Sequence, residues 1–197
     1  MNDFNLILLQ PPSDNSSQFQ NYCMKNDYSK EEFTSYLEFL KDILARLFVF
    51  TTNDGLCCLI FPNNLISNSN LVYAHIVSMG TSSHTWGLND EIILMAENKK
   101  SFGKIAVLKK GDLVETMSRA ERLTYISIPE EEKVAISKSV WIMNPLKGDF
   151  MDEKIVRWLI LSYSNPDEKI HDPFPEYTNS KKICLTLGRK FLESITT

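Results

Sequence analysis

Residues 5–13 carry the sequence NLILLQPPS, in which a short apolar run ends at two consecutive prolines. Because proline lacks the backbone N–H that a central strand must donate, a buried strand is expected to end where the prolines begin. A second apolar run, LCCLIF at residues 56–61, shows no alternation of apolar and polar residues. Such strands are typical of parallel sheets that are covered on both faces. The two runs therefore predict an α/β protein with a mostly parallel central sheet.

Helices are expected around this sheet. The stretch 29–48 begins with the Ser-x-x-Glu spacing of a capping box and continues with apolar residues at helical spacing. Residues 152–163 also carry apolar residues on one side. A third helix is expected at residues 178–187, because Gly188 supplies the left-handed residue that commonly closes a helix.

The rest of the chain is assigned from composition. Residues 14–28 are rich in Asn, Ser and Gln and predict a long loop, and residues 119–138 form a charged stretch without a clear period. Further strands are expected at residues 71–79, 91–95, 105–108, 140–142, 169–171 and 190–192. Neither an internal repeat nor a linker divides the sequence, so a single domain is expected over residues 1–197.

The composition is that of a globular domain. The 197 residues are 43% hydrophobic and 11% aromatic, which suffices for one core and excludes disordered and collagen-like chains. No apolar run approaches the ~20 residues that cross a bilayer, and the N-terminus lacks the basic segment of a signal peptide. We therefore expect an intracellular protein without membrane contact, cytoplasmic or, in a eukaryote, nuclear.

Cysteine and histidine give no sign of a metal centre. The four cysteines include the vicinal pair Cys57 and Cys58 but no C-x-x-C, so reduced thiols are expected and neither disulfides nor a structural zinc. His75, His84 and His171 have no metal-ligand spacing among themselves or with the cysteines. A G-x-S-x-G elbow, which would indicate a hydrolase, is missing from the sequence. No metal is expected.

The charges suggest a local basic region on an acidic protein. With 21 basic and 25 acidic side chains the net charge is −4, which argues against non-specific coating of nucleic acid. Between residues 99 and 122 basic side chains outnumber acidic ones, so this segment is a candidate nucleic-acid-binding surface, and a solvated hairpin surface is the alternative. Its basic residues are Lys99, Lys100, Lys104, Lys109, Lys110, Arg119 and Arg122.

The order of short motifs along the chain resembles that of a known enzyme family. NLILLQPPS is similar to the strand and catalytic D/N/S-P-P-Y motif of the amino-methyltransferases that modify adenine N6 or cytosine N4 in DNA. The second half of the chain resembles the group whose catalytic motif precedes its cofactor motif. In that group a W-x-x-x-P segment, a helix and an S-x-P turn lead to D-P-F-x-G-x-G-T-T, a helix and L-G-R-x-F. The matching segments are SVWIMNP (139–145), SYSNP (162–166), IHDPF (170–174) and LGRKF (187–191).

This resemblance covers nearly the whole chain and has consequences for its fold. It implies a Rossmann-like S-adenosylmethionine methyltransferase fold, with a mostly parallel central sheet flanked by helices. About residues 80–138 would be a target-recognition or insert region. Since open α/β sheets bind ligands beyond the carboxyl ends of their strands, the site is expected directly after the strands that carry the two motifs.

The cofactor motif departs from the family pattern. The resemblance implies cofactor-binding positions at Asp172, Pro173, Phe174, Glu176, Thr178 and Glu193. Glu176 and Thr178 stand where the family has glycines that admit the methionyl part of the cofactor, so charge and bulk would meet the cofactor carboxylate. Glu193 lies near, but not in register with, the acid that binds the ribose hydroxyls. We therefore expect no tightly bound cofactor, and S-adenosylmethionine only if the protein is active.

The catalytic motif is altered as well. Its positions are Gln10, Pro11, Pro12 and Ser13. The amide oxygen of Gln10 can still accept a hydrogen bond from a target amino group, and the prolines keep the turn. Ser13 has no ring to stack on a base that has been flipped out of a duplex.

Three hypotheses about function follow. The first is a catalytically degenerate methyltransferase-like protein that binds DNA or RNA, or that supports an active methyltransferase subunit as its protein partner. The second is an active, divergent, site-specific DNA amino-methyltransferase in which Gln10 orients the target amine. The third is a purely structural subunit that binds only protein. Cofactor binding would favour the second, and salt-sensitive nucleic-acid binding without cofactor would favour the first.

Overall fold

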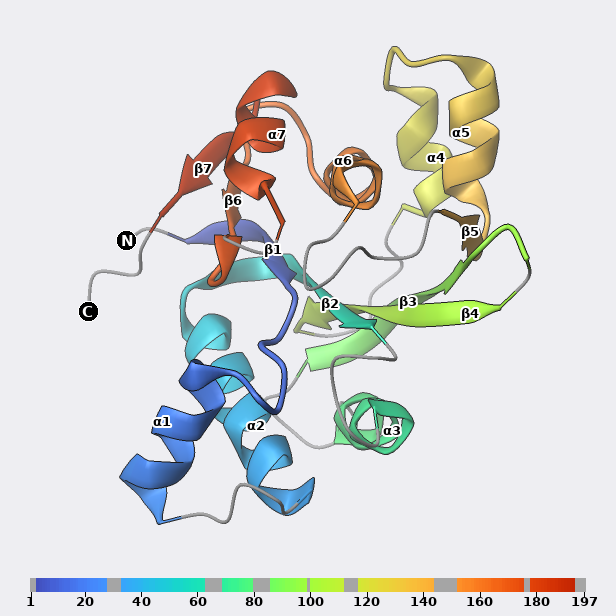
Figure 1. Ribbon diagram of the computed structural model, residues 1–197. Helices are drawn as coiled ribbons and strands as arrows, with labels where there is room; N and C mark the ends of the chain where they lie inside the picture. Colours follow the sequence, from blue (N-terminus) through green and yellow to red (C-terminus); the bar gives the residue numbers. More distant parts are fainter. Residues whose placement is uncertain are drawn as a thin grey trace.

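Within the described residues of the computed structural model (3–27, 33–62, 69–79, 86–98, 100–111, 117–143, 152–175 and 178–193), seven strands form one sheet. Their spatial order is β5-β3-β4-β2-β1-β6-β7 (Figure 1). The strands are β1 (Phe4–Leu9), β2 (Thr51–Pro62), β3 (Trp86–Met95), β4 (Ser101–Lys110), β5 (Val140–Ile142), β6 (Lys169–His171) and β7 (Lys190–Leu192).

The sheet is mostly parallel, which confirms the sequence prediction. Parallel pairs join β1 to β2 and β6, β6 to β7, and β3 to β5. Only β4 runs against its neighbours, pairing antiparallel with both β2 and β3. Residues 96–100, which connect β3 to β4, are too few for the crossover of about a dozen residues that a parallel pair requires.

Helices cover the sheet in two layers. In Figure 1, one layer lies below the sheet and the other above it. The lower layer contains α1 (Ser17–Asn26), α2 (Phe33–Val49) and α3 (Ser69–Met79). The upper layer contains α4 (Arg119–Thr124), α5 (Glu130–Ser137), α6 (Glu153–Tyr163) and α7 (Ser180–Thr186).

Burial on both faces explains the continuous apolar runs in the central strands. Leu6 and Leu8 of β1 belong to the core under α6, whereas Ile7 and Leu9 belong to the core over α2. All four side chains are fully buried. Since successive residues of a strand point to opposite faces, a strand between two helical layers needs apolar residues at every position.

The sequence prediction is wrong for residues 71–79, which form helix and not strand. They lie in α3, whose buried side chains Val72, Tyr73 and Ile76 share one side of the helix. The β-branched and aromatic residues of this segment favour a strand on propensity alone. Packing of that one side against the sheet stabilises the helix instead. Strand propensity reflects side-chain packing and burial more than an intrinsic preference of the backbone.

The predicted loop at residues 14–28 contains a helix, α1. The Ser16 hydroxyl caps it by accepting a hydrogen bond from the backbone N–H of Phe19, at 3.2 Å. Phe19 and Cys23 are its buried residues. An apolar stripe this narrow is hard to recognise in a sequence that is otherwise Asn, Ser and Gln.

The charged stretch at residues 119–138 forms two short helices, α4 and α5. Ser118 and Glu121 make a complete capping box at the start of α4. Two tryptophans donate hydrogen bonds to α5. The indole N–H of Trp141, in β5, donates to the carbonyl oxygen of Ile136 (3.0 Å), and that of Trp158, in α6, donates to the Glu132 carboxylate (2.9 Å). The rings of Trp141 and Trp158 pack edge to face at 5.2 Å.

Two further searches cover only the residues that the structure describes. No helix among them is long and apolar enough to cross a membrane. Among the same residues, no three or more His, Cys, Asp or Glu side chains gather in a way that could hold a metal ion. The four cysteines lie among the described residues, are buried and form no disulfide bond with one another, and burial raises the pKa of Cys57 and Cys58.

Candidate cofactor and base-binding site

The two motifs meet at one edge of the sheet. β1 and β6 are adjacent parallel strands, with Ile7 opposite His171. Gln10 therefore follows one strand and Asp172 the next, at the edge where open α/β sheets bind their ligands. The structure thus brings together the two segments that the sequence singled out, although they lie at opposite ends of the chain.

The turn after β1 is tightly held. Gln10 is 1% exposed, Pro11 and Pro12 are buried, and Ser13 is partly buried. From α2 the Tyr36 hydroxyl donates a hydrogen bond of 2.7 Å to the carbonyl oxygen of Pro12. Burial raises the pKa of Tyr36, with a further contribution from Asp14, so the hydroxyl remains a donor. The Gln10 amide is thus inside the protein and does not face solvent.

The loop after β6 closes on itself through Asp172. One carboxylate oxygen of Asp172 accepts the backbone N–H of Phe174 at 2.9 Å, and the other accepts the Thr178 hydroxyl at 2.5 Å. The Thr178 oxygen also accepts the backbone N–H of Ser180 at 3.2 Å. Asp172 is 0% exposed and Thr178 is 1% exposed. Thr178, at a position where the resemblance implies a glycine, is therefore part of the loop's own hydrogen-bonding network.

These residues do not fit the cofactor loop that the resemblance implies. That loop depends on glycine so that the backbone can approach the ligand. Here the buried Thr178 side chain stands where the resemblance implies a glycine, and its hydroxyl donates a hydrogen bond to one carboxylate oxygen of Asp172 in the same loop. Glu176, the other expected obstruction, lies outside the described residues.

Glu193 directly follows β7, at the same edge of the sheet. Its carboxylate forms an ion pair and a hydrogen bond with Lys181 of α7, and this contact lowers the pKa of Glu193. Both side chains are more than half exposed. Glu193 lies near, but not in register with, the ribose-binding acid that the resemblance implies, and it has a lysine as its partner.

His171, the last residue of β6, is a buried titratable group. Its ring stacks on Phe4 with 4.4 Å between centroids, and its Nδ1 lies 2.8 Å from the carbonyl oxygen of Leu192. Burial lowers the pKa of His171 from its ordinary value of 6.5. The unfolded chain consequently binds this proton more readily than the folded protein, so the contribution of His171 to stability falls as pH drops below 6.5.

We expect this histidine to account for part of any loss of stability between about pH 7.5 and about pH 5. His171→Phe keeps a ring against Phe4 but cannot titrate, so its free energy of unfolding should decline less over that interval. Urea unfolding at a series of pH values measures the difference. Equal slopes for His171→Phe and wild type would contradict the expectation.

The lysines of β4 are engaged within the protein. Lys109 is 1% exposed and forms an ion pair with Asp54 at 3.0 Å. The Lys110 ammonium donates to the carbonyl oxygens of Phe48 (2.7 Å) and Thr51 (2.6 Å). Both lysines therefore have structural partners near the start of β2.

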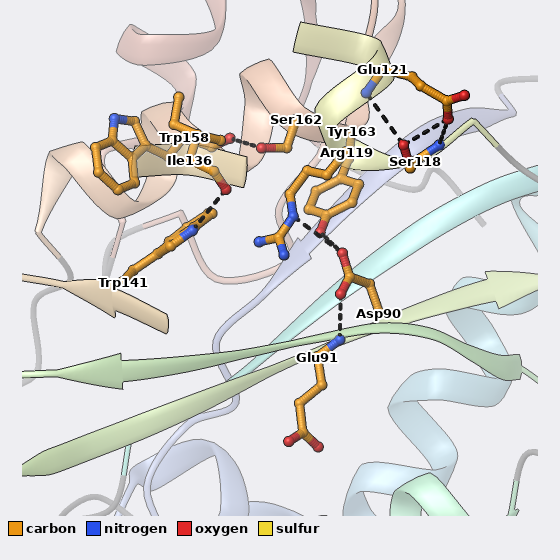
Figure 2. A network of polar contacts seen from close by, with 10 residues as sticks. All are labelled: Asp90, Glu91, Ser118, Arg119, Glu121, Ile136, Trp141, Trp158, Ser162 and Tyr163. Carbon is orange, nitrogen blue, oxygen red and sulfur yellow. Dashed lines mark hydrogen bonds and ion pairs between the residues drawn. The ribbon is translucent and has the colours of Figure 1, made fainter. Parts of the chain in front are cut away.

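The remaining basic residues are divided between the two helical layers. Lys104 lies 4.9 Å from the ring centroid of Tyr73 in α3, in the lower layer. Arg119 lies in the upper layer, where it is 7% exposed and pairs with Asp90 at 3.3 Å (Figure 2). The structure does not bring these residues together on one surface. Lys100 is exposed, Arg122 is partly buried in α4, and Lys99 lies outside the described residues.

The S-x-P and L-G-R landmarks contact each other and have a structural role. The Arg189 guanidinium, 7% exposed, donates to the Ser164 hydroxyl (3.2 Å), the Ser164 carbonyl oxygen (2.8 Å) and the Leu187 carbonyl oxygen (2.5 Å). These bonds tie the end of α6 to the turn before β7. Tyr36, Lys181 and the Ser164–Arg189 contact escaped the sequence analysis, because none of them has a spacing that signals a site.

Comparisons with known proteins show the fold. No protein-family model matches the chain, and no curated protein matches it either. Among solved structures, a DNA modification methylase of Thermus thermophilus in complex with S-adenosyl-L-methionine has a TM-score of 0.66 at 14% identity, covering 99% of this chain and 82% of its own. The cytosine-N4-specific PvuII DNA methyltransferase gives 0.66 at 11% identity, covering 96% and 74%. M1.HpyAVI, solved as a SAM complex, gives 0.55 at 12% identity, covering 96% and 81%.

The expected Rossmann-like methyltransferase fold is therefore confirmed. The resemblance to DNA amino-methyltransferases, first drawn from motif order, holds at the level of the fold. It extends over almost the whole chain, including the stretch 80–138, in which the described residues form β3, β4, α4 and α5.

Proposed function

We propose that this chain is a catalytically degenerate relative of the DNA adenine-N6 and cytosine-N4 methyltransferases that supports an active subunit of a methyltransferase complex. The observation that carries the proposal is the hydrogen bond from the buried Thr178 hydroxyl to Asp172. It closes, with the protein's own atoms, the loop that a methyltransferase of this fold would keep open for its cofactor.

The altered turn after β1 supports the same conclusion. A base that leaves its stack must be held by hydrogen bonds to its edge and by stacking on a side chain. Gln10 is buried, and Ser13 offers no ring. The loss of base stacking is independent of the change in the cofactor loop, and both weaken methyl transfer.

A protein partner explains the retained fold better than an extended nucleic-acid surface on this chain alone. Four of the candidate basic residues already have internal partners: Lys104, Lys109, Lys110 and Arg119. Contacts of this kind hold these cationic groups against the protein itself, so fewer of them can reach phosphates. The active partner would then supply the cofactor and the pocket for the base, with DNA or RNA bound mainly by that partner.

Calorimetric titration of the purified, folded chain with S-adenosylmethionine, and separately with S-adenosylhomocysteine, tests the proposal. We expect no saturable heat up to the millimolar range, because Thr178 holds the loop closed. Circular dichroism of the same sample confirms that the protein is folded. Saturable binding of either compound would overturn the degenerate assignment and would call for methylation assays on DNA.

An active, divergent DNA amino-methyltransferase is the second candidate. Glu193, which directly follows β7, favours it, because this acid lies near, although not in register with, the ribose-binding acid that the resemblance implies. Its carboxylate would have to leave Lys181 to reach a ligand. Transfer of a labelled methyl group to DNA by the chain alone would establish this candidate over the first.

A further inference from the structure

A hollow separate from the candidate site lies between the end of α4 and the turn that follows α6, in the upper layer (Figure 1). Its volume is about 530 Å³, within the range of small-molecule sites, roughly 300–1,000 Å³. Residues 164–166, which line it, come before β6, and Arg189, which also lines it, comes before β7. The candidate site follows the carboxyl ends of β1 and β6. The hollow therefore lies at the other edge of the sheet.

Two exposed side chains stand at this hollow. Tyr125, directly after α4, is 80% exposed, the highest fraction of any large hydrophobic side chain among the described residues. Met117, just before α4, is 47% exposed. Leu161, which is 3% exposed, and the partly buried Ile126 add apolar surface to the lining. Single exposed apolar side chains are common, but two that share one hollow with an apolar lining indicate a place that a ligand covers.

The Tyr125 ring is available for stacking. Neither its ring nor its hydroxyl has a ring contact or hydrogen bond with another described residue. Arg122 precedes it by one helical turn, on the same side of α4, and lines the same hollow. The Arg122 guanidinium is likewise without an ion pair or hydrogen bond to the described residues. Aromatic rings and guanidinium planes both stack on flat heterocycles.

Hydrogen-bonding groups accompany these stacking groups. The side-chain amide of Asn165 donates to Glu168 at 2.8 Å, and its amide oxygen has no partner among the described residues. The exposed Ser127 also lines the hollow. An acceptor, a hydroxyl and the Arg122 donors are thus available to a ligand.

A flat ring with a polar edge suits both sets of groups. Its faces can contact Tyr125 and Met117, and its edge can bond to Arg122 and Asn165. A phenylalanine ring would cover the same apolar surface but would displace water from the polar groups without replacing its hydrogen bonds, which costs free energy. The lining therefore favours a heterocycle over an apolar side chain of a protein partner.

We infer that this hollow binds a nucleobase, stacked on the Tyr125 ring, with Arg122 and Asn165 at its polar edge. The base belongs to a free nucleoside or to a single-stranded nucleic acid, which present the same ring. The site goes beyond the proposed function, because it uses neither the cofactor loop nor the turn after β1. Failure of one proposal leaves the other standing.

Titration of the whole chain with thymidine tests the inference, because thymidine carries a base but no charge. The readout is the methionine methyl signals in an NMR spectrum, with the Met117 signal identified by its absence from the Met117→Leu variant. The ring current of a stacked base shifts the signals of nearby methyl groups, so we expect a saturable shift of the Met117 signal. The Met24 signal should not move, because Met24 is exposed on α1 in the opposite helical layer.

Three further probes identify what the hollow takes. Tighter binding of tetrathymidylate than of thymidine would support a base within a single strand, and equal affinity would support a free nucleoside. The compound 2-deoxyribose 5-phosphate lacks the base and should not shift the Met117 signal. N-acetylphenylalaninamide represents an aromatic side chain of a protein partner. If either of the last two compounds bound as tightly as thymidine, the inference would be wrong.

Two variants of Tyr125 complete the experiment. Because this side chain is 80% exposed, both should fold like wild type, which circular dichroism checks. Tyr125→Phe keeps the ring and should bind thymidine like wild type. Tyr125→Ser should weaken binding at least about fivefold, the effect of losing one stack between a base and an aromatic ring. Absence of a saturable Met117 shift with both thymidine and tetrathymidylate, or equal affinity for wild type and Tyr125→Ser, would overturn the inference.

Discussion

Arg189→Met is expected to lower the free energy of unfolding by about 3 kcal/mol, because it removes a buried charged donor from three acceptors. Those acceptors are the Ser164 hydroxyl and the carbonyl oxygens of Ser164 and Leu187. Methionine fills much of the same volume but donates nothing, so the two carbonyl oxygens lose this partner. Chemical denaturation of the wild type and the variant measures the difference.

Two controls separate the hydrogen bonds from the charge. Lys190→Met, at the neighbouring position, removes an exposed pair with Asp167 at 3.6 Å and should change the free energy of unfolding by less than about 0.5 kcal/mol. Arg189→Lys keeps the charge but not the planar donors, so it should recover only part of the lost stability. If Arg189→Met were as stable as Lys190→Met, the S-x-P and L-G-R landmarks would not form a stabilising contact.

The double change Glu176→Gly and Thr178→Gly is expected to raise the affinity for S-adenosylhomocysteine at least about tenfold, toward measurable binding, since it removes a charge and a buried side chain together. Loss of the Thr178 hydroxyl frees one oxygen of Asp172 and the space that the side chain fills. Calorimetry under identical conditions compares the double variant with wild type.

The single changes show which obstruction matters. Thr178→Gly alone should give part of the gain if the hydrogen bond to Asp172 closes the loop, whereas Glu176→Gly alone should do so if charge dominates. Thr178→Ser keeps the hydroxyl and should remain without measurable binding. A double variant that folds, as judged by circular dichroism, and still gains no affinity would show that the loop is not the cause of the missing binding.

The secondary structure of segments with a clear apolar period could be predicted from the sequence. That of segments whose conformation depends on contacts with the rest of the fold could not. α6 has an apolar face broad enough to identify, and β1 and β2 each carry a continuous apolar run, Leu6–Leu9 and Leu56–Phe61, because both faces of the sheet are buried there. α1 buries little beyond Phe19 and Cys23, so its pattern is lost among polar residues. In α3 the local composition favours a strand, and only contact with the sheet decides for a helix.

The candidate site shows the same division. Motif order and the edge rule for open sheets correctly bring the turn after β1 next to the loop after β6. The bond between Thr178 and Asp172 depends on side-chain directions that no spacing reveals. The contacts of the basic side chains were hidden from the sequence in the same way: Lys104 of β4 contacts Tyr73 of α3, whereas Arg119 begins α4 and pairs with Asp90.

The central position of β1 has a consequence for how the chain folds. One neighbour of β1 is β6, and the backbone N–H of Lys169 donates to the Asn5 side chain across 164 positions of sequence. Contacts this distant require closure of a very long loop before they contribute, which slows folding. During synthesis β1 must wait until the residues of β6, Lys169–His171, have left the ribosome. Until then the backbone N–H and C=O groups on one side of this apolar strand stay unpaired. Nascent chains should therefore be prone to edge-to-edge association or depend on chaperones.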